Sequence, residues 1–432
     1  MKPPLKIAIA GLGTVGAGVV KLIETNADVL ASRCGRPLAV TAVSAKNRGR
    51  NRGIDISHAR WFDDAAEMAR TADAEVVVEL IGGSDGIAKK VCDTAIAARR
   101  HVVTANKAML ALHGTALARA AESAGVVLAY EASVAGGIPI INALREGLAA
   151  NKLSRVYGIL NGTCNYILTE MLRTGREFAD VLREAQTLGY AEADPSFDVD
   201  GIDTAHKLAV LTAVAFGAEV NFGGVYIEGI RHVSAQDIAY AGELGYRIKL
   251  LGIARRTEQG IEQRVHPCMV ELASSIAHVD GVYNAVVAEG DFVGRTVFQG
   301  RGAGAGPTAS AVVADLIAIA RGNNAPAFAV PAADLVKLPA LAMDRHIGAY
   351  YIRLMVRDRP GVIADVTAAL RDEEVSLESM LQRGRSPEGA VPVVLTTHAT
   401  EEAAMKRALA RIAALKTVAE PPRVIRIEPL EH

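Results

Sequence analysis

A glycine-rich turn near the N-terminus constrains the fold of this chain more than any other feature. Gly11, Gly13 and Gly16 follow the spacing G-x-G-x-x-G directly after the apolar run 5–10, and they open a segment with helical character over 13–26. Such glycines permit a tight turn and the close approach of a pyrophosphate, and the helix start adds free N–H groups. The pattern predicts a dinucleotide-binding unit whose cofactor contacts are Gly11, Leu12, Gly13, Thr14, Val15 and Gly16. The alternative is a glycine-rich turn without a ligand.

Strand-like and helix-like segments alternate through the first 130 residues. Short apolar runs without alternation occur at 5–10, 38–44, 75–80, 101–104 and 126–130. Helical stretches lie between them at 13–26, 63–71, 87–99 and 115–124. Apolar strands that alternate with helices are typical of an α/β fold, in which helices cover both faces of a parallel sheet. We therefore predict a Rossmann-type domain over residues 1–130.

Two further domains are expected after residue 130. Residues 131–325 mix helices with several strands and predict an α+β domain with a mixed sheet, suited to substrate binding and dimerisation. Its last helix, 308–321, is a candidate to pack back onto the Rossmann-type domain. Residues 326–345 contain prolines and little periodicity, so we interpret them as a linker. The order β-α-β-β-α-β over 346–432, with a loop at 384–389, predicts a ferredoxin-like domain.

Composition narrows the class of protein. The 432 residues carry a net charge of −1, which argues against a nucleic-acid partner, because phosphate binding requires a basic surplus. The four cysteines are far apart and form no CxxC pair, as expected of a reduced chain without a zinc site. No signal-peptide pattern and no run of about 18 apolar residues occurs, so we expect a cytoplasmic protein without a membrane span.

The end of the second predicted strand bears on the choice of dinucleotide. NAD enzymes usually present an acidic residue there, whereas this chain has Ser44-Ala45-Lys46-Asn47-Arg48. A cation such as Arg48 suits the 2′-phosphate of NADP, so we favour NADP over NAD. A solvated basic loop is an equal alternative.

Several segments together resemble homoserine dehydrogenases. They are TANK at 104–107, YEASV at 130–134, NGTCNY at 161–166, GYAEADP at 189–195, GIDTAHK at 201–207 and GAGAGPT at 302–308. Their order and spacing extend the resemblance over about residues 5–325. The family reduces aspartate 4-semialdehyde reversibly to homoserine with a nicotinamide cofactor, in the biosynthesis of threonine, methionine and isoleucine, and the resemblance implies the same reaction here.

Asp203 and Lys207 are the predicted catalytic residues. They are four apart on a predicted helix and hence lie on one face. Hydride addition to an aldehyde creates an alkoxide that needs a proton donor. The resemblance implies that Lys207 gives this proton and that Asp203 orients it. The alternative is an ordinary ion pair, although the apolar run at 208–216 indicates a buried helix.

The resemblance implies further contacts with substrate and cofactor. Glu192, with Asp198 as a second candidate, would bind the substrate ammonium; in isolation these acids would form a solvated loop. Lys107, at the end of a predicted strand, would lie beside cofactor and substrate, where the alternative is a surface lysine. The remaining implied substrate contacts are Gly162, Thr163 and Tyr190. The remaining implied cofactor contacts are Thr104, Gly304 and Gly306.

The segment 131–138 resembles the family's monovalent-cation loop. Glu131 would offer its side chain, and Val134, Gly136 and Ile138 would offer carbonyl oxygens. Oxygen ligands suit a hard cation such as Na⁺ or K⁺, and the role would be structural. From the residues alone the segment is a glycine-containing turn.

Cys164 raises a rival hypothesis, because the family often has a different small residue there. Acylating semialdehyde dehydrogenases use a cysteine nucleophile with a histidine base. No histidine is placed convincingly for that role, and a buried cysteine most often acts as a small apolar residue.

The C-terminal unit resembles ACT domains. Asp358-Arg359-Pro360-Gly361 joins a predicted strand to a helix and matches the D-x-P-G signature, so backbone N–H groups can face a ligand carboxylate. ACT domains usually pair and bind amino acids, which implies threonine as an effector and a homo-oligomer, either dimer or tetramer. The alternatives are a ferredoxin-like packing module without a ligand, and a non-catalytic NAD(P)-binding amino-acid sensor.

Overall fold

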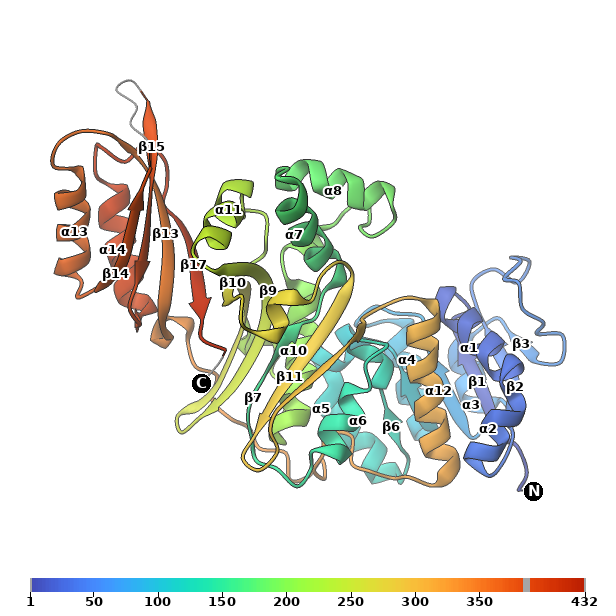
Figure 1. The fold of residues 1–432 in the computed structure, drawn as a ribbon. Helices are drawn as coiled ribbons and strands as arrows, with labels where there is room; N and C mark the ends of the chain where they lie inside the picture. The colour runs from blue at the N-terminus through green and yellow to red at the C-terminus, as the bar shows by residue number, and fades with distance from the viewer. Residues whose placement is uncertain (1, 384–388, 431–432) are drawn as a thin grey trace.

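The computed structural model describes residues 2–383 and 389–430 (Figure 1). The chain forms a row of three domains, from the N-terminal domain at one end, coloured blue, to the C-terminal domain at the other, coloured red. The predicted fold class is confirmed. Within the described residues, no helix combines the length and the apolar character that a membrane crossing needs.

The N-terminal domain contains a parallel sheet of six strands. Its spatial order is β3-β2-β1-β4-β5-β6. The strands are β1 (Leu5–Ala10), β2 (Leu38–Ser44), β3 (Arg60–Phe62), β4 (Val76–Glu79), β5 (His101–Thr104) and β6 (Leu128–Ala129). Because the chain runs from β1 to β2 on one side and later returns to β4 on the other, the strand order reverses next to β1. In such sheets this reversal marks the ligand-binding edge.

The helices of this domain differ in part from the prediction. They are α1 (Thr14–Thr25), α2 (Ala27–Cys34), α3 (Ala65–Thr71), α4 (Ile87–Ala97) and α5 (Lys107–Ala124). The short helix α2 and the short strand β3 were not predicted, because neither shows clear periodicity. Helix α5 begins at Lys107 rather than Thr115, since the Asn106 side chain caps it by accepting the Met109 N–H at 3.1 Å.

The middle domain packs helices against a mostly antiparallel sheet. Its strands are β7 (Leu153–Ile159), β8 (Tyr226–Ile227), β9 (Tyr246–Thr257), β10 (Gly260–Glu271), β11 (Tyr283–Gly290) and β12 (Gly294–Arg301). Its helices are α6 (Ile140–Asn142), α7 (Gly162–Thr174), α8 (Phe178–Thr187), α9 (Ser196–Val199), α10 (Ile202–Phe216), α11 (Ala235–Glu243) and α12 (Ala305–Arg321).

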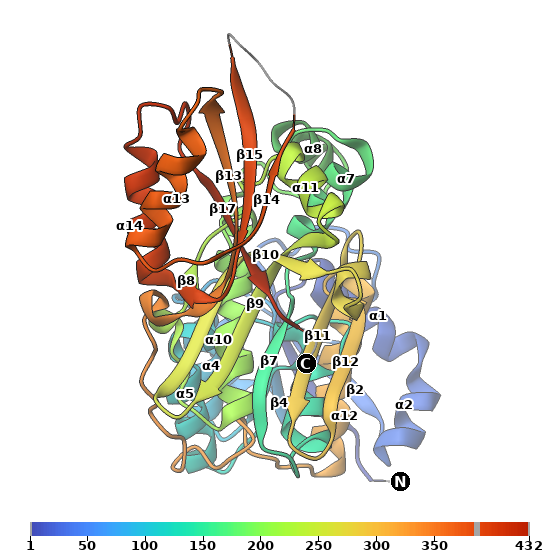
Figure 2. The ribbon, with the colours of Figure 1, turned by 60° about the vertical axis from the view of Figure 1, so that its left-hand side comes forward.

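The C-terminal domain has the predicted β-α-β-β-α-β order. Its elements are β13 (Ile347–Arg357), α13 (Val362–Asp372), β14 (Leu377–Gln382), β15 (Ala390–Thr397), β16 (Thr400–Glu401), α14 (Glu402–Ala413) and β17 (Arg423–Glu428). Helices α13 and α14 cover one face of its sheet, and α11 lies on the side of the other face (Figures 1 and 2). The predicted loop at 384–389 lies outside the described residues except for Gly389.

One sheet runs through the middle and C-terminal domains. Strand β17 pairs in parallel with β10 and antiparallel with β13, which joins the two domains in one sheet of eleven strands. Nine of them follow in the order β12-β11-β7-β9-β10-β17-β13-β15-β14, while β8 pairs with β10 and β16 pairs with β13. Across this junction Arg264 pairs with Glu428, both buried. The C-terminal domain was predicted as a separate unit, because local patterns cannot reveal a pairing between strands so distant in the chain.

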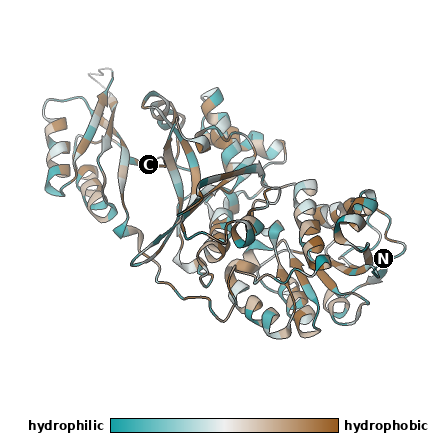
Figure 3. Cartoon of the chain, turned by 60° about the horizontal axis from the view of Figure 1, so that its bottom comes forward, coloured by the Kyte–Doolittle hydropathy of each residue, from teal (hydrophilic) through white to brown (hydrophobic). Residues whose placement is uncertain are grey.

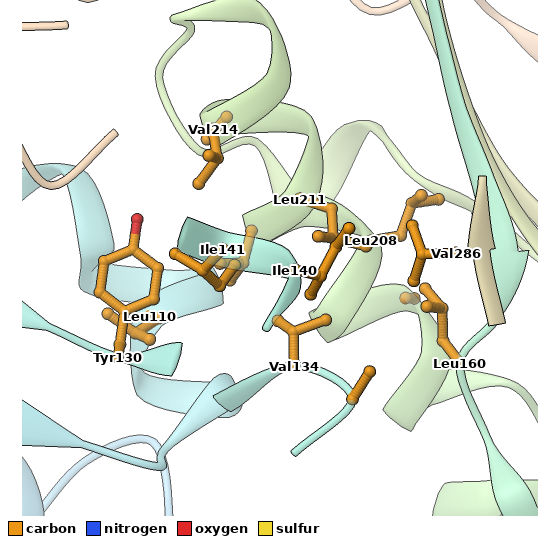
Figure 4. Packing of buried hydrophobic residues seen from close by; sticks show 14 of the residues in the cluster. Leu110, Tyr130, Val134, Ile140, Ile141, Leu160, Leu208, Leu211, Val214 and Val286 are labelled. Atoms are coloured by element: carbon orange, nitrogen blue, oxygen red, sulfur yellow. The ribbon is translucent and has the colours of Figure 1, made fainter. Parts of the chain in front are cut away.

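Buried apolar side chains join the first two domains. Leu110 and Tyr130 of the N-terminal domain and Ile141 of the middle domain share a core with Leu211 and Val214 of α10 (Figure 4). Helix α10 is buried on nearly every side. This burial holds Asp203 and Lys207, in its first turns, in place. Figure 3 shows hydrophobic residues, in brown, gathered on the N-terminal sheet and the helices that cover it.

Two later segments pack back on earlier ones. Ala309, Val312 and Leu316 of α12 share a core with Val19 and Val20 of α1. The segment 326–345, interpreted as a linker, is partly anchored: Tyr130 donates a hydrogen bond to Ala327 O at 2.5 Å, and Val336 bridges to Ala218.

Candidate active site

The backbone of the glycine-rich turn packs so closely that only glycine, which has no Cβ, fits at Gly11 and Gly16. Gly11 has φ +102°, and a Cβ on it would lie 2.5 Å from Leu80 O. A Cβ on Gly16 would lie 2.1 Å from Gly11 O. Gly13 caps α1 without a side-chain hydrogen bond, so the first-turn N–H groups of Thr14, Val15 and Gly16 stay free for an anion. This arrangement fits a dinucleotide pyrophosphate.

The basic loop after β2 folds back onto the glycine-rich turn. Arg52 donates from Nε to Leu12 O at 3.0 Å, and the guanidiniums of Arg48 and Arg52 lie 5.8 and 5.7 Å from the Trp61 ring. Arg48 makes no hydrogen bond or ion pair with the described residues. Of these three side chains, only Arg48 was predicted as a cofactor contact.

The buried residue Glu79, at the end of β4, forms hydrogen bonds with the loop that follows β4 and with the end of β5. Thr104, a predicted cofactor contact, donates its hydroxyl to Glu79 Oε2 at 2.6 Å. The other oxygen of Glu79 accepts the Ile81 and Gly82 N–H groups at 2.7 and 3.0 Å. Glu79 therefore shapes the loop beside the glycine-rich turn, although its sequence context gave no signal for this role.

Two lysines converge on one carboxylate. Lys207 Nζ lies 2.7 Å from Asp203 Oδ2, and Lys107 Nζ lies 3.0 Å from Asp203 Oδ1. Lys207 also donates to Leu160 O at 2.7 Å. Lys107 comes from the N-terminal domain and the other two residues from α10, so the site spans the junction of the two domains.

Burial and charge fix the ionisation of this group. Burial alone would raise the pKa of Asp203, but Lys207 and Lys107 hold that pKa well below its usual range. Burial alone would lower the pKa of Lys107, but Asp203 raises that pKa above its ordinary value. Asp203 is thus a carboxylate and Lys107 an ammonium at neutral pH.

Asn161 links this group to the acidic loop. Its Nδ2 donates to Asp203 Oδ2 at 2.8 Å and to Asp198 Oδ1 at 2.7 Å, while its Oδ1 accepts the Cys164 N–H at 2.8 Å. Burial and the charge of Asp203 raise the pKa of Asp198. Asn161 lies within the NGTCNY segment, but no role was predicted for it from the sequence.

The other predicted substrate residues lie at the start of α7 and in the acidic loop. Thr163 donates its hydroxyl to Tyr190 O at 2.6 Å, and Gly162 starts α7 in a place where a Cβ would lie 2.8 Å from Val282 O. Glu192 is exposed, and its charge contributes to the raised pKa of Lys107. Glu192 thus faces solvent near the lysines, outside the hydrogen-bonded group.

An aromatic wall adjoins the lysines. Phe197 lies 5.8 Å from Lys107 Nζ, and the His206 ring stands between Phe197 and Phe222 at centroid distances of 5.5 and 4.4 Å. Burial lowers the pKa of His206. His206 lies within the GIDTAHK segment, but no role was predicted for it, for Phe197 or for Phe222.

The predicted cation loop is buried between the domains. Both carboxylate oxygens of Glu131 accept backbone N–H groups, from Ile141 at 2.9 Å and Asn142 at 2.8 Å. Ile138 O accepts the Ile140 N–H at 2.7 Å, whereas the carbonyls of Val134 and Gly136 accept no hydrogen bond from the described residues. The two free carbonyls suit a cation, but the Glu131 side chain is already engaged with the start of α6.

The two glycines expected at the end of the cofactor site lie at the start of α12. Gly304 has φ +120° and caps this helix, and Gly306 lies in its first turn. A Cβ on Gly18 of α1 would lie 3.1 Å from Ala305 O, so α12 approaches α1 closely here. The segment therefore borders the helix that carries the nucleotide turn.

Cys164 does not have the environment of a nucleophile. It is buried, and its thiol contacts Asp198 O at 3.2 Å. Burial raises the pKa of this thiol well above its ordinary value, which keeps it protonated.

A glycine-rich nucleotide turn on a parallel sheet, next to a buried lysine–aspartate pair, defines an NAD(P)-dependent oxidoreductase. The family models for homoserine dehydrogenase, for its NAD-binding domain and for the ACT domain match residues 139–317, 11–131 and 350–416. The chain is 46% identical to a homoserine dehydrogenase of Neisseria gonorrhoeae over 433 residues, 99% of each chain. It is 46% identical to one of Pseudomonas aeruginosa over 434 residues, with the same coverage. The chain belongs to the homoserine dehydrogenase family, whose members are oxidoreductases that act on a CH–OH group.

Solved structures of homoserine dehydrogenases have the same fold as this chain. A homoserine dehydrogenase from Thiobacillus denitrificans superposes with a TM-score of 0.93 at 45% identity, covering 100% of this chain and 99% of that one. The enzyme of S. aureus superposes with a TM-score of 0.78 at 30% identity over 100% of both chains. The full three-domain architecture is therefore shared.

Proposed function

We propose that this enzyme reduces L-aspartate 4-semialdehyde to L-homoserine with NADPH, reversibly, in the cytoplasmic synthesis of threonine, methionine and isoleucine. The observation that carries the proposal is the buried group in which Asp203 holds Lys207 and Lys107 together. An aldehyde that also carries an α-ammonium suits this site. The two lysine ammoniums would face the aldehyde oxygen, and the carboxylates of the acidic loop would face the substrate ammonium.

The proton in this reaction comes from the protein. When bound, the nicotinamide supplies hydride to the aldehyde carbon. Lys207 then gives a proton from Nζ to the resulting alkoxide oxygen, while Asp203 and Leu160 O fix the direction of its N–H bonds. Lys107 stabilises the developing negative charge on the same oxygen. Asp198 and Glu192 are the acceptors for the substrate ammonium, and Gly162, Thr163 and Tyr190 line its pocket.

The NADP preference rests on the loop after β2. Arg48 lies beside Trp61 and has no anionic partner among the described residues, and no acidic side chain ends β2. A 2′-phosphate would supply the missing anion.

Two further proposals concern ions and effectors. The free carbonyls of Val134 and Gly136, with Glu131 and Ile138 beside them, suit Na⁺ or K⁺ in a structural role. The ACT domain supports feedback inhibition by an amino acid, for which we propose threonine, in a homo-oligomer.

Substrate discrimination tests the proposed reaction. NADPH oxidation by the full chain should be rapid with aspartate 4-semialdehyde and at least about 100-fold slower in kcat/KM with succinate semialdehyde, which lacks the α-ammonium. Equal rates with both aldehydes would contradict an amino-acid substrate.

A further inference from the structure

A cleft between the C-terminal and middle domains is lined by charged side chains that have no part in the dehydrogenase reaction. It has a volume of about 470 Å³ and is bounded by the starts of α8 and α11 on one side and by β13 and β17 on the other. A second hollow of about 220 Å³ adjoins it and shares His232, Val233 and Arg423. Figure 2 shows α11 and α8 beside the sheet face that α13 and α14 leave uncovered.

Two guanidiniums meet on this face of the sheet. Arg353 of β13 and Arg423 of β17 are direct cross-strand partners. Arg353 is neutralised by Asp237 of α11, whose oxygens accept its Nε and Nη2 at 2.6 and 3.1 Å. The Arg423 guanidinium makes no hydrogen bond or ion pair with residues 2–383 or 389–430. Like charges directly opposite on a sheet are unfavourable, so an anion at Arg423 would stabilise the pair.

Two carboxylates also line the cleft, together with Arg231, which is paired with Asp200. Glu420 lies at the rim, and its charge contributes to the raised pKa of Arg353. Glu177 lies opposite, where its Oε2 accepts the Ala235 N–H at 3.3 Å. A cavity with one unpaired guanidinium and two carboxylates matches a small zwitterion, whose carboxylate would pair with Arg423 and whose ammonium would face Glu420.

The wall of the cleft contacts the active-site loop directly. Residues 228–231, the bridging segment, run between the two sites. Glu228 accepts a hydrogen bond from Arg426 of β17 at 2.8 Å, Ile230 N donates to Val199 O at 2.9 Å, and Arg231 pairs with Asp200. A Cβ on Gly229 would lie 2.2 Å from Val199 O, so the backbone of the segment packs directly on that loop.

We propose that this cleft binds a small amino acid within a single chain, with Arg423 as the carboxylate partner, and that the bridging segment transmits binding to the loop that holds Asp198. The proposal deepens the regulation proposed above. It places the effector at the junction of two domains, away from the turn at Asp358–Gly361.

Calorimetric titration of the full chain with L-threonine, L-methionine and L-isoleucine tests the site. At least one of them should bind, and R423Q and E420Q should each weaken that binding at least tenfold. R371Q, on the exposed surface of α13, should leave it unchanged. Binding should also slow amide hydrogen exchange in residues 196–200 and 228–231.

Failure of the cleft and failure of the enzymatic proposal are distinguishable. A chain that oxidises NADPH with aspartate 4-semialdehyde but binds none of the three amino acids overturns the cleft alone, as does wild-type affinity in both R423Q and E420Q. A chain that binds an amino acid through Arg423 without reducing the semialdehyde refutes the proposed reaction and supports the cleft.

Discussion

Asn161 and Asp203, from different elements of the middle domain, are joined by a buried hydrogen bond of 2.8 Å. The same Asn161 amide reaches Asp198, so one side chain spaces two carboxylates that would otherwise repel each other. The catalytic group therefore depends on the start of α7 as much as on α10.

N161A should lower kcat/KM for the semialdehyde by about 10- to 100-fold, since a hydrogen bond to a charged group contributes about 1.5–3 kcal/mol. The KM for NADPH should stay unchanged, because the side chain of Asn161 bonds Asp198, Asp203 and Cys164 rather than the glycine-rich turn. Steady-state kinetics check this, with thermal unfolding to show that N161A still folds. Wild-type kcat/KM in N161A would exclude the positioning role.

R48E should raise the KM for NADPH at least about tenfold and leave the KM for NADH within a factor of about two, because only NADPH carries the 2′-phosphate. R70E, on the exposed side of α3, is the matched charge reversal outside the loop and should change neither value. If R48E affected both cofactors equally, the basic loop would have no role in choosing between them.

Asp315 should make the protein less stable at alkaline pH. Burial and the neighbouring charge of Glu131 raise the pKa of Asp315 to about 8, so the folded state keeps a proton that the unfolded chain has lost above about pH 4. The free energy of unfolding should fall as the pH rises from about 4 to 8, by up to about 1.4 kcal/mol per pH unit for one proton.

D315N tests this dependence, because asparagine can still accept the Glu131 N–H that Asp315 accepts at 2.9 Å. Urea unfolding at pH 5.5, 7 and 8.5, at constant sodium concentration, should show a flatter profile for D315N. Parallel profiles for D315N and the wild type would rule out Asp315 as the source.

C164A should retain most of the activity, because the thiol is buried and protonated. The measurement is kcat with aspartate 4-semialdehyde, together with a circular dichroism spectrum. Loss of the reaction in a folded C164A enzyme would instead favour thioester chemistry.

Local rules predicted some parts of this site and could not predict others. Asp203 and Lys207 could be paired from sequence, because four residues on a helix always bring two side chains to one face. The contacts of this pair with Lys107 and Asn161 could not be predicted from spacing, because those two residues come from distant segments of the chain. Glu79 and His206 gave no signal, since a lone acid or histidine on an apolar element is usually structural.

The fold, like the site, was predictable from the sequence only in part. The parallel sheet and the β-α-β-β-α-β order followed from apolar runs and helical periodicity. The junction of β10 with β17 did not, because a buried ion pair such as Arg264–Glu428 cannot be assigned from either strand alone.

Removal of the Lys207 ammonium tests the central claim most directly. K207M should lower kcat with aspartate 4-semialdehyde by about 10²–10⁴-fold, the usual contribution of a positioned proton donor, with the KM for NADPH nearly unchanged. K89M, which breaks an exposed ion pair of the same spacing with Asp93, should keep wild-type kcat. A K207M enzyme with kcat close to that of the wild type would contradict the account.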